Sequence, residues 1–239
     1  MQSLKNKVAF ITGGTKGIGY GVAEVLMAEG MNVVITGRNQ EAAEKAARDL
    51  NQNSIGKAYG IASDVRNFES QQNAINQAIE KFGELDLVFA NAGLGHFGSI
   101  ENISIDQWNE VIDTNLTGVF YTAKASIETL KKTKGYLITL SSLAGTNFFP
   151  QGAAYNASKF GVTGMSQAIM LDLRQYGIRV STLMPGSVTS HFNGHTPDEN
   201  DAWKIQPEDI GELIAGLLQL NARTLPSKIE IRPSTPPTK

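Results

Sequence analysis

The stretch KVAFITGGTKGIG, residues 7–19, decides the fold, because an apolar segment runs directly into a glycine-rich turn. Residues 7–12 have the composition of a buried strand, and a helical pattern follows the turn. Gly13, Gly17 and Gly19 are spaced as G-x-x-x-G-x-G, which departs from the G-x-G-x-x-G pattern. Such glycines permit a tight turn in which backbone amides approach a pyrophosphate. The turn is therefore a candidate dinucleotide site, with close packing alone as the alternative.

The rest of the chain repeats this alternation of short apolar runs and helical stretches. Further strands are expected at 32–36, 56–63, 85–90, 135–141, 178–184 and 228–233. Helices are expected at 17–30, 40–51, 67–82, 106–132, 153–176 and 207–220. Parallel strands need crossover connections and are buried on both faces, which fits both observations. The prediction is a Rossmann-type α/β fold, with a doubly wound, mainly parallel seven-stranded sheet flanked by helices on both faces.

No linker or internal repeat divides the chain, so residues 1–239 are expected to form a single domain. The segment 189–204 is polar and poorly periodic, and it is expected to be a substrate loop. Half of the 8 prolines fall in the last stretch of the chain. Residues 233–239 are therefore expected to form a flexible tail.

The composition excludes several classes of function. The chain has no cysteine, and its three histidines (His96, His191 and His195) are too scattered for a metal site, so none is expected. A net charge of −2 gives no basic field for nucleic acid or an anionic membrane surface. The N-terminus lacks a signal peptide's apolar core, and no stretch is long and apolar enough for a membrane span. We expect a cytoplasmic protein without a nucleic-acid or membrane partner.

The end of the second expected strand bears on the choice of dinucleotide. An acidic residue there would hold the ribose 2′-hydroxyl of NAD, whereas an arginine suits the 2′-phosphate of NADP. The strand ends in ITGRN, which has no carboxylate and places Arg38 at this position. Lys16, within the glycine-rich turn, supplies a second cation. The pair favours NADP(H) over NAD(H).

Further motifs follow in order at the ends of the expected strands and in the helices between them. They are ASDV (62–65), ANAG (90–93), DTNLTGVF (113–120), LSSLAG (140–145), Tyr155 with Lys159, and PGSVT (185–189). In this order they resemble the compact, single-domain branch of the short-chain dehydrogenase/reductase family. The resemblance extends from about residue 6 to residue 190.

The resemblance implies a catalytic set of Asn115, Ser142, Tyr155 and Lys159. Ser142 is preferred to Ser141 because the family serine usually lies thirteen residues before the tyrosine. Tyr155 would be the general acid/base, and the Lys159 ammonium would favour its phenolate by lowering a pKa that is ordinarily near 10. Ser142 would orient the carbonyl group, and Asn115 would hold a water that resupplies protons through Lys159.

The resemblance also implies which residues hold the cofactor. Asp64 would bond the adenine amino group beside the backbone of Val65, and Lys159 would bond the nicotinamide ribose. The segment 91–93 would pass under the adenine ribose, and the segment 185–189 would hold the carboxamide. The expected cofactor residues are Gly13, Thr15, Lys16, Gly17, Ile18, Gly19, Arg38, Asp64, Val65, Asn91, Ala92, Gly93, Tyr155, Lys159, Pro185, Gly186, Val188 and Thr189.

The function implied is an NADP(H)-dependent oxidoreductase that transfers a hydride between the nicotinamide and a small-molecule carbonyl or secondary alcohol. A catalytically idle dinucleotide sensor or scaffold is the alternative, and it is disfavoured because the whole catalytic set is present. A sugar-nucleotide epimerase or dehydratase is disfavoured by the short chain and the glycine spacing. The resemblance also implies a homodimer or homotetramer.

Some features leave the substrate open. Phe148 and Phe149 fit either a hydrophobic substrate pocket or ordinary core packing, and His96 and His191 are candidates to border the substrate. The chain ends in IEIRPSTPPTK, where the family often has an aspartate-glycine-glycine turn, and the loop after Thr189 is short. These regions usually close the substrate pocket, so the sequence does not identify the substrate.

Overall fold

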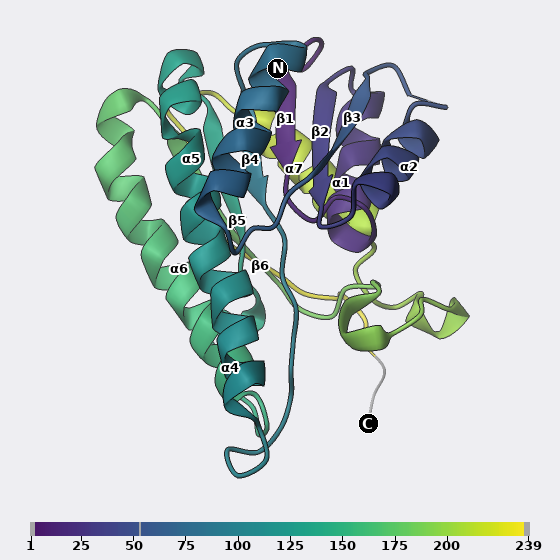
Figure 1. Cartoon of the computed structure of the whole chain (residues 1–239), viewed down its shortest axis with the longest axis vertical. Helices are drawn as coiled ribbons and strands as arrows, with labels where there is room; N and C mark the ends of the chain where they lie inside the picture. The colour runs from purple at the N-terminus through teal and green to yellow at the C-terminus, as the bar shows by residue number, and fades with distance from the viewer. Residues whose placement is uncertain (1–2, 53, 237–239) are drawn as a thin grey trace.

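The computed structural model describes residues 3–52 and 54–236, and its centre is a sheet of parallel strands (Figure 1). Each strand pairs with its neighbours in parallel, in the order β3-β2-β1-β4-β5-β6-β7. The strands are β1 (Val8–Ile11), β2 (Asn32–Gly37), β3 (Ala58–Ala62), β4 (Leu87–Ala90), β5 (Tyr136–Leu140), β6 (Arg179–Pro185) and β7 (Lys228–Ile231). The predicted doubly wound α/β fold is confirmed.

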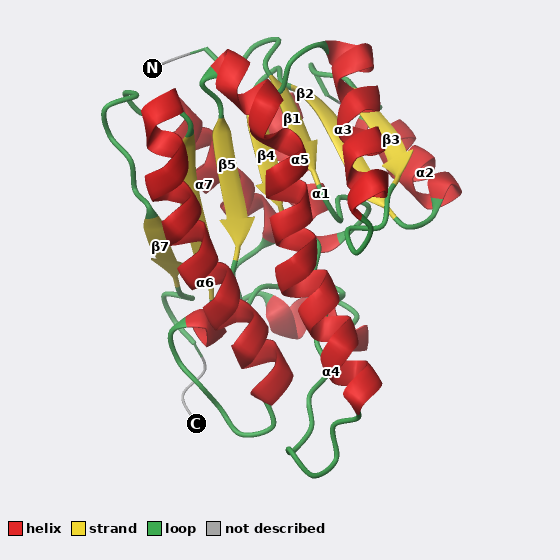
Figure 2. Cartoon of the chain, turned by 60° about the vertical axis from the view of Figure 1, so that its left-hand side comes forward, coloured by secondary structure: helices red, strands yellow, loops and turns green. Residues whose placement is uncertain are grey.

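Helices cover both faces of the sheet (Figure 2). One layer is α1 (Gly17–Ala28), α2 (Gln40–Leu50) and α7 (Pro207–Gln219), in which α1 packs closely on α7. The other is α3 (Phe68–Phe82), α5 (Gly118–Thr133) and α6 (Ala153–Leu173), and α4 (Ile105–Ile112) leads into α5 at its outer end. No helix among the described residues is both long enough and apolar enough to cross a membrane.

Alternation along the strands divides the core into two clusters. Ala9 and Ile11 of β1 pack in the cluster on the α1, α2 and α7 side, whereas Val8 and Phe10 pack in the cluster on the α3 and α5 side. Successive strand residues point to opposite faces, so a strand covered on both sides must be apolar at every position. This requirement accounts for the continuous apolar run that opens the chain.

The strand order reverses direction at β1, which has β2 on one side and β4 on the other. The connection from β1 leads to β2 on one side, and the connection from β4 leads to β5 on the other. Because the two connections leave in opposite directions, a crevice opens at the carboxyl ends of β1 and β4. The crevice is held together by the Thr12 hydroxyl, which accepts hydrogen bonds from the backbone amides of Asn91 and Ala92, both at 3.0 Å. The glycine-rich turn lies at this crevice.

The long helix predicted at 106–132 is interrupted. A π-helical turn, Asp113–Thr117, separates α4 from α5. A π turn leaves the ordinary hydrogen-bond register for one turn and is often found at functional sites. The spacing of apolar residues does not reveal such a turn, because the residues buried within it, Thr114 and Asn115, are polar.

The segment 189–204 lacks long elements, as predicted, but it is not structureless. It contains two 3₁₀ turns, Phe192–Gly194 and Glu199–Asp201. Its base is closed by a bridge between Val188 and Ile205, in which the Ile205 amide donates to the Ser187 carbonyl at 3.1 Å. The predicted tail at 233–239 lies partly outside the described residues, which end at 236.

Candidate active site

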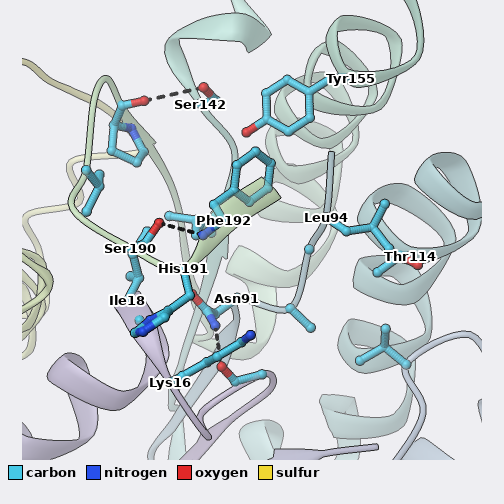
Figure 3. A pocket seen from close by; sticks show the side chains of 18 of the residues that line it. Lys16, Ile18, Asn91, Leu94, Thr114, Ser142, Tyr155, Ser190, His191 and Phe192 are labelled. Atoms are coloured by element: carbon cyan, nitrogen blue, oxygen red, sulfur yellow. Dashed lines mark hydrogen bonds between the residues drawn. The ribbon is translucent and has the colours of Figure 1, made fainter. Parts of the chain in front are cut away.

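A cavity of about 720 Å³ opens at the carboxyl ends of the strands, over the reversal point between β1 and β4. It is lined by the glycine-rich turn, the ends of the first six strands, the start of α6 and the loop after β6. Figure 3 shows Ser142, Tyr155 and Phe192 at one end and Lys16, Ile18 and His191 at the other. Residues far apart in the sequence therefore share one pocket.

The glycines of the turn have separate structural tasks. Gly13 and Gly17 have φ angles of 66° and 59°, a region that favours glycine. A Cβ atom at Gly19 would lie 2.6 Å from the side-chain nitrogen Nδ2 of Asn91 and 2.7 Å from the backbone carbonyl oxygen of Gly13. At the start of α1, Lys16 makes no side-chain cap, and the first turn has no acidic residue. The amides that open α1 are thus available to an anion.

Lys16 and Arg38 lie where the sequence places them, on the pocket lining at the turn and at the end of β2. Both side chains are exposed, and among the described residues neither forms an ion pair. Two unneutralised cations therefore face this end of the cavity.

Asp64 also lines the pocket, but its carboxylate already has a partner that the sequence did not indicate. The Arg66 guanidinium donates to it at 2.7 and 3.0 Å, and the Arg66 amide donates to Oδ1 at 3.0 Å. Hydrogen bonding from Arg66 lowers the pKa of Asp64 below its ordinary value. Lone pairs remain on the carboxylate, so it can still accept a further donor, and Arg66 itself joins the pocket lining.

Tyr155, near the start of α6, points into the pocket beside Ser142 (Figure 3). Phe97 and Phe192 pack against its ring, with centroids 5.4 and 5.6 Å away. Burial raises the pKa of Tyr155 to about 12, and the Ser142 hydroxyl opposes this with a smaller lowering. This direction is opposite to the lowering expected from Lys159 together with an oxidised nicotinamide ring, because in the protein by itself burial disfavours the charged phenolate.

Lys159, one helical turn after Tyr155, is buried, with only 4% of its surface exposed. Its ammonium donates to the Leu140 carbonyl at 2.9 Å and lies 5.6 Å from the centroid of the Tyr155 ring. Burial lowers the pKa of Lys159 from 10.5 to about 8. Because the folded protein holds this charge in an apolar setting with one hydrogen bond, the burial is destabilising.

Ser141 and Ser142 both line the pocket, but their hydroxyls have different partners. The Ser141 hydroxyl donates to the Lys159 carbonyl at 3.0 Å and pairs with Thr163 at 2.8 Å, so it fastens β5 to α6. The Ser142 hydroxyl accepts from the Ala144 amide at 3.1 Å, donates to the Pro185 carbonyl at 3.4 Å, and lies close enough to the Tyr155 phenol to lower its pKa. Its hydroxyl remains available at the end of the pocket near Tyr155.

Asn115 lies in the π turn and is fully buried. Its amide oxygen accepts from the Leu94 amide at 2.8 Å, and its amide nitrogen donates to the Leu94 carbonyl at 2.8 Å and to Ser158 at 3.1 Å. The side chain is thus occupied by protein groups and does not line the pocket. It joins the segment after β4 to the start of α6.

Most of the remaining predicted cofactor residues line the pocket. They are Gly13, Thr15, Gly17, Ile18, Val65, Asn91, Ala92, Gly93, Pro185, Gly186 and Val188. Gly19 and Thr189 do not. Gly19 lies beneath the turn, and Thr189 turns away, with its hydroxyl donating to the Asp201 carbonyl at 3.2 Å and accepting from Gln206. The Thr189 side chain thus bonds neighbouring loop residues, and its role at the cofactor stays a prediction.

Of the aromatic and histidine residues that were candidates to border the substrate, some line the pocket and others do not. Phe149 lines the pocket, whereas Phe148 is 86% exposed outside it. His191 lines the pocket, but His96 does not and instead pairs with Glu110 at 2.7 Å. Phe97, Phe192 and Arg66 were not singled out from the sequence, because each reaches the pocket only through the path of a loop.

Comparison with known proteins gives a consistent result. Residues 7–201 match the family model described as short chain dehydrogenase. The chain is 36% identical over 220 residues to trans-4-hydroxycyclohexanecarboxylate dehydrogenase of Sinomonas cyclohexanicum, covering 87% of this chain and 84% of the relative.

Two solved structures are similar over nearly their full length. An alcohol dehydrogenase of Thermococcus sibiricus, complexed with 5-hydroxy-NADP, has a TM-score of 0.90 and 30% identity, covering 98% of this chain and 99% of the other. A 3-ketoacyl-(acyl-carrier-protein) reductase of Brucella melitensis, complexed with NADH, has a TM-score of 0.86 and 26% identity, covering 97% and 99%. The similar proteins thus include complexes with both kinds of nicotinamide cofactor.

Proposed function

The chain belongs to the short-chain dehydrogenase family of oxidoreductases, and from this premise we propose that it is an NADP(H)-dependent carbonyl reductase or alcohol dehydrogenase. Two of the similar proteins, named as an alcohol dehydrogenase and a ketoacyl reductase, support a carbonyl or secondary alcohol as the reacting group. The observation that carries the proposal is the position of Tyr155 and Ser142 together at one end of a pocket whose other end is built for an anion.

The residues present fit a nicotinamide dinucleotide. The open amides at the start of α1 suit the pyrophosphate, and the glycine-rich turn leaves room where a Cβ atom would collide. Asp64 and Val65 would hold the adenine, the segment 91–93 would lie under its ribose, and Pro185, Gly186 and Val188 would hold the carboxamide. When bound, the cofactor supplies or accepts the hydride.

We assign the preference for NADP(H) to Arg38 and Lys16. A guanidinium and an ammonium without ion-pair partners among the described residues suit the two negative charges of a 2′-phosphate. The end of β2 has no carboxylate to bond a 2′-hydroxyl.

Tyr155 acts as the proton donor when a carbonyl group is reduced. Since burial holds the pKa of its phenol at about 12, the hydroxyl is protonated at neutral pH, which is the form that donates. As the carbonyl carbon gains a C–H bond and the C=O π bond breaks, the proton on Tyr155 Oη passes to the carbonyl oxygen. In the reverse direction the phenolate form of Tyr155, stabilised by the Lys159 ammonium, accepts the proton from the alcohol.

Ser142 and Lys159 support this transfer. The Ser142 hydroxyl donates to the substrate oxygen and stabilises the negative charge that develops there. The Lys159 ammonium, held against the Leu140 carbonyl, stabilises the phenolate left after proton transfer and would also bond the nicotinamide ribose. Asn115 positions rather than reacts, because both ends of its amide are bound to the Leu94 backbone. If a water at Asn115 resupplies protons through Lys159, it would therefore hydrogen-bond to the Asn115 backbone, because the side-chain amide is already bonded to Leu94.

A panel of ketones followed at the absorbance band of NADPH tests the proposal. We expect NADPH consumption with at least one ketone, and a lower KM for NADPH than for NADH. Tight binding of NADPH without turnover of any ketone or secondary alcohol would instead favour the idle sensor.

We also propose that the protein is a homodimer or homotetramer, as members of this family generally form oligomers. The outer surfaces of α5 and α6 expose Phe120, Phe160 and Leu171, which are 45%, 43% and 53% exposed. Large apolar side chains exposed on helix surfaces are typical of an interface between subunits.

A further inference from the structure

We propose that the pocket is built for a substrate with an aromatic ring beside its carbonyl or alcohol carbon. The inference rests on the proposed function and concerns the part of the pocket around Tyr155. Three phenylalanines, Phe97, Phe149 and Phe192, form this part, and we refer to them as the aromatic enclosure.

Phe97 and Phe192 contact the Tyr155 ring, and Phe149 joins the group through Phe97. Phe97 lies at the centre, with ring centroids 5.4 Å from Tyr155, 6.0 Å from Phe149 and 6.3 Å from Phe192. The interplanar angles in these pairs are 59°, 47° and 65°, so no two rings stack face to face. Tilted rings at these separations are the favoured aromatic geometry, and a further flat ring can join such a group.

The enclosure is open to the cavity and is not a sealed part of the core. Phe97 and Phe149 are 39% and 43% exposed, and both line the cavity. None of the three belongs to either of the large core clusters that hold the sheet between its helices. Their free surfaces are therefore available to a ligand that reaches Tyr155.

Two glycines lie directly against these rings, at positions where a larger residue would collide with them. A Cβ atom at Gly95 would lie 2.7 Å from Cζ of Phe192 and 3.0 Å from Cε2 of Phe97. A Cβ atom at Gly152 would lie 2.7 Å from Cε2 of Phe149. The two loops are also tied together, because the Gly98 amide donates to the Gln151 carbonyl at 2.9 Å.

The charged side chains of the described pocket lining are either bound to other protein groups or, like Lys16 and Arg38, lie at the glycine-rich turn and the end of β2. Lys204 and His195 pair with the buried carboxylate of Asp201. Lys159 donates to the Leu140 carbonyl, and Arg66 is bound to Asp64. Lys16 and His191 lie at the opposite end of the pocket from Tyr155 in Figure 3. An apolar, flat group is thus the complement of the enclosure, and a charged one is not.

Three methyl ketones with the same number of carbon atoms test the inference: acetophenone, cyclohexyl methyl ketone and 2-octanone. We expect kcat/KM for acetophenone to exceed that for 2-octanone by roughly tenfold, because each aromatic pair contributes roughly two- to tenfold. Cyclohexyl methyl ketone should fall between them, since it has the shape of a ring without its π faces. Equal kcat/KM values, or a preference for 2-octanone, would overturn the inference.

Variants separate the aromatic contribution from general apolar burial. Phe97→Leu should reduce kcat/KM for acetophenone roughly tenfold and for 2-octanone less than about threefold. Phe148→Leu is the matched control, because its neighbour Phe149 lines the pocket while Phe148 itself does not, and it should change neither value. Gly95→Ala should act like Phe97→Leu by displacing two rings, with Gly216→Ala, where nothing lies within 4 Å, as its control. A loss with Phe97→Leu that is equal for both ketones would contradict an aromatic site.

A binding measurement keeps the inference separate from the proposed function. Acetophenone should bind the Tyr155→Phe protein loaded with NADPH, with a lower Kd in calorimetry than 2-octanone, and Phe97→Leu in that background should remove the difference. Selective binding without turnover by the unmodified protein would contradict the proposed function and leave the enclosure intact. Turnover without any aromatic preference would contradict the enclosure alone.

Discussion

At the scale of the residue, Tyr155 and Lys159 are neighbours on one helix, and burial moves their pKa values in opposite directions. Burial raises the pKa of the phenol to about 12 and lowers that of the ammonium to about 8. Sequence alone predicts the pair, its order and its proximity to Ser142. It does not predict the desolvation, because Phe97 and Phe192 reach the phenol from separate loops.

Lys159→Met should stabilise the protein at neutral pH. The Lys159 pKa falls from 10.5 in the unfolded chain to about 8 in the folded protein, and this difference corresponds to about 3 kcal/mol of destabilisation of the folded state. Between these pH values the unfolded chain binds more protons than the folded one, so the penalty is fully present below pH 8 and is relieved as pH rises to 10.5. Urea unfolding at pH 7 should show a free energy of unfolding higher by about 2 kcal/mol, since the Leu140 carbonyl also loses its donor.

The same measurement at pH 10.5 should show most of that gain gone. Lys124→Met, at an exposed position of α5, serves as the control and should change stability little at either pH. A Lys159→Met protein that is less stable than the unmodified chain at pH 7 would contradict the account of Lys159 as a destabilising buried charge.

Arg38→Ala should weaken NADPH binding by roughly ten- to a hundredfold, the range for a hydrogen bond to a charged group. The Kd for NADH should change less than about threefold, because NADH has no 2′-phosphate. Arg48→Ala, on the same side of the sheet and outside the pocket, is the control. An unmodified protein that binds NADH more tightly than NADPH would refute the assignment of Arg38 and Lys16.

At the scale of the element, the π turn shows where helix prediction by pattern ends. The residues of 106–132 are helical throughout, but the wider turn at Asp113–Thr117 carries Asn115. From there its amide reaches both backbone groups of Leu94. The sequence indicates that Asn115 belongs to the site, and the structure shows that its side chain acts by fixing a neighbouring loop.

Asn115→Ala should lower the free energy of unfolding by about 2–4 kcal/mol, because it leaves the amide and carbonyl of Leu94 and the Ser158 hydroxyl without this partner. Asn109→Ala, at an exposed position of α4, should cost less than about 0.5 kcal/mol. Chemical denaturation of both variants measures the difference. Equal losses in the free energy of unfolding for Asn115→Ala and Asn109→Ala would show that the hydrogen bonds from Asn115 to Leu94 do not stabilise the fold.

At the scale of the whole molecule, the strand order explains why distant motifs meet. The reversal at β1 places the ends of β1 and β4 beside each other, and the remaining parallel strands deliver their motifs to the same edge. For this reason the fold and most pocket residues follow from the sequence. Thr189 and Arg66 do not, because their contacts with Asp201 and Asp64 depend on how loops settle after the sheet has formed.

The exposed apolar side chains of α5 and α6 lead to a prediction about assembly. Sedimentation at micromolar concentration should show a dimer or tetramer, and Phe160→Glu should shift it toward the monomer, because a charge would be buried in the interface. Lys57→Glu, at an exposed position just before β3 and outside α5 and α6, is the control for a change of charge alone. A monomeric unmodified protein would remove the proposed oligomer.

The central claim is that Tyr155 donates the proton when a carbonyl group is reduced with NADPH. The most direct measurement compares the unmodified protein with Tyr155→Phe, using one ketone substrate and fluorescence to follow NADPH binding. The account predicts an unchanged Kd for NADPH to within about threefold and a kcat lower by roughly 10²- to 10⁴-fold. A Tyr155→Phe protein that binds NADPH and reduces the ketone at the unmodified rate would contradict it.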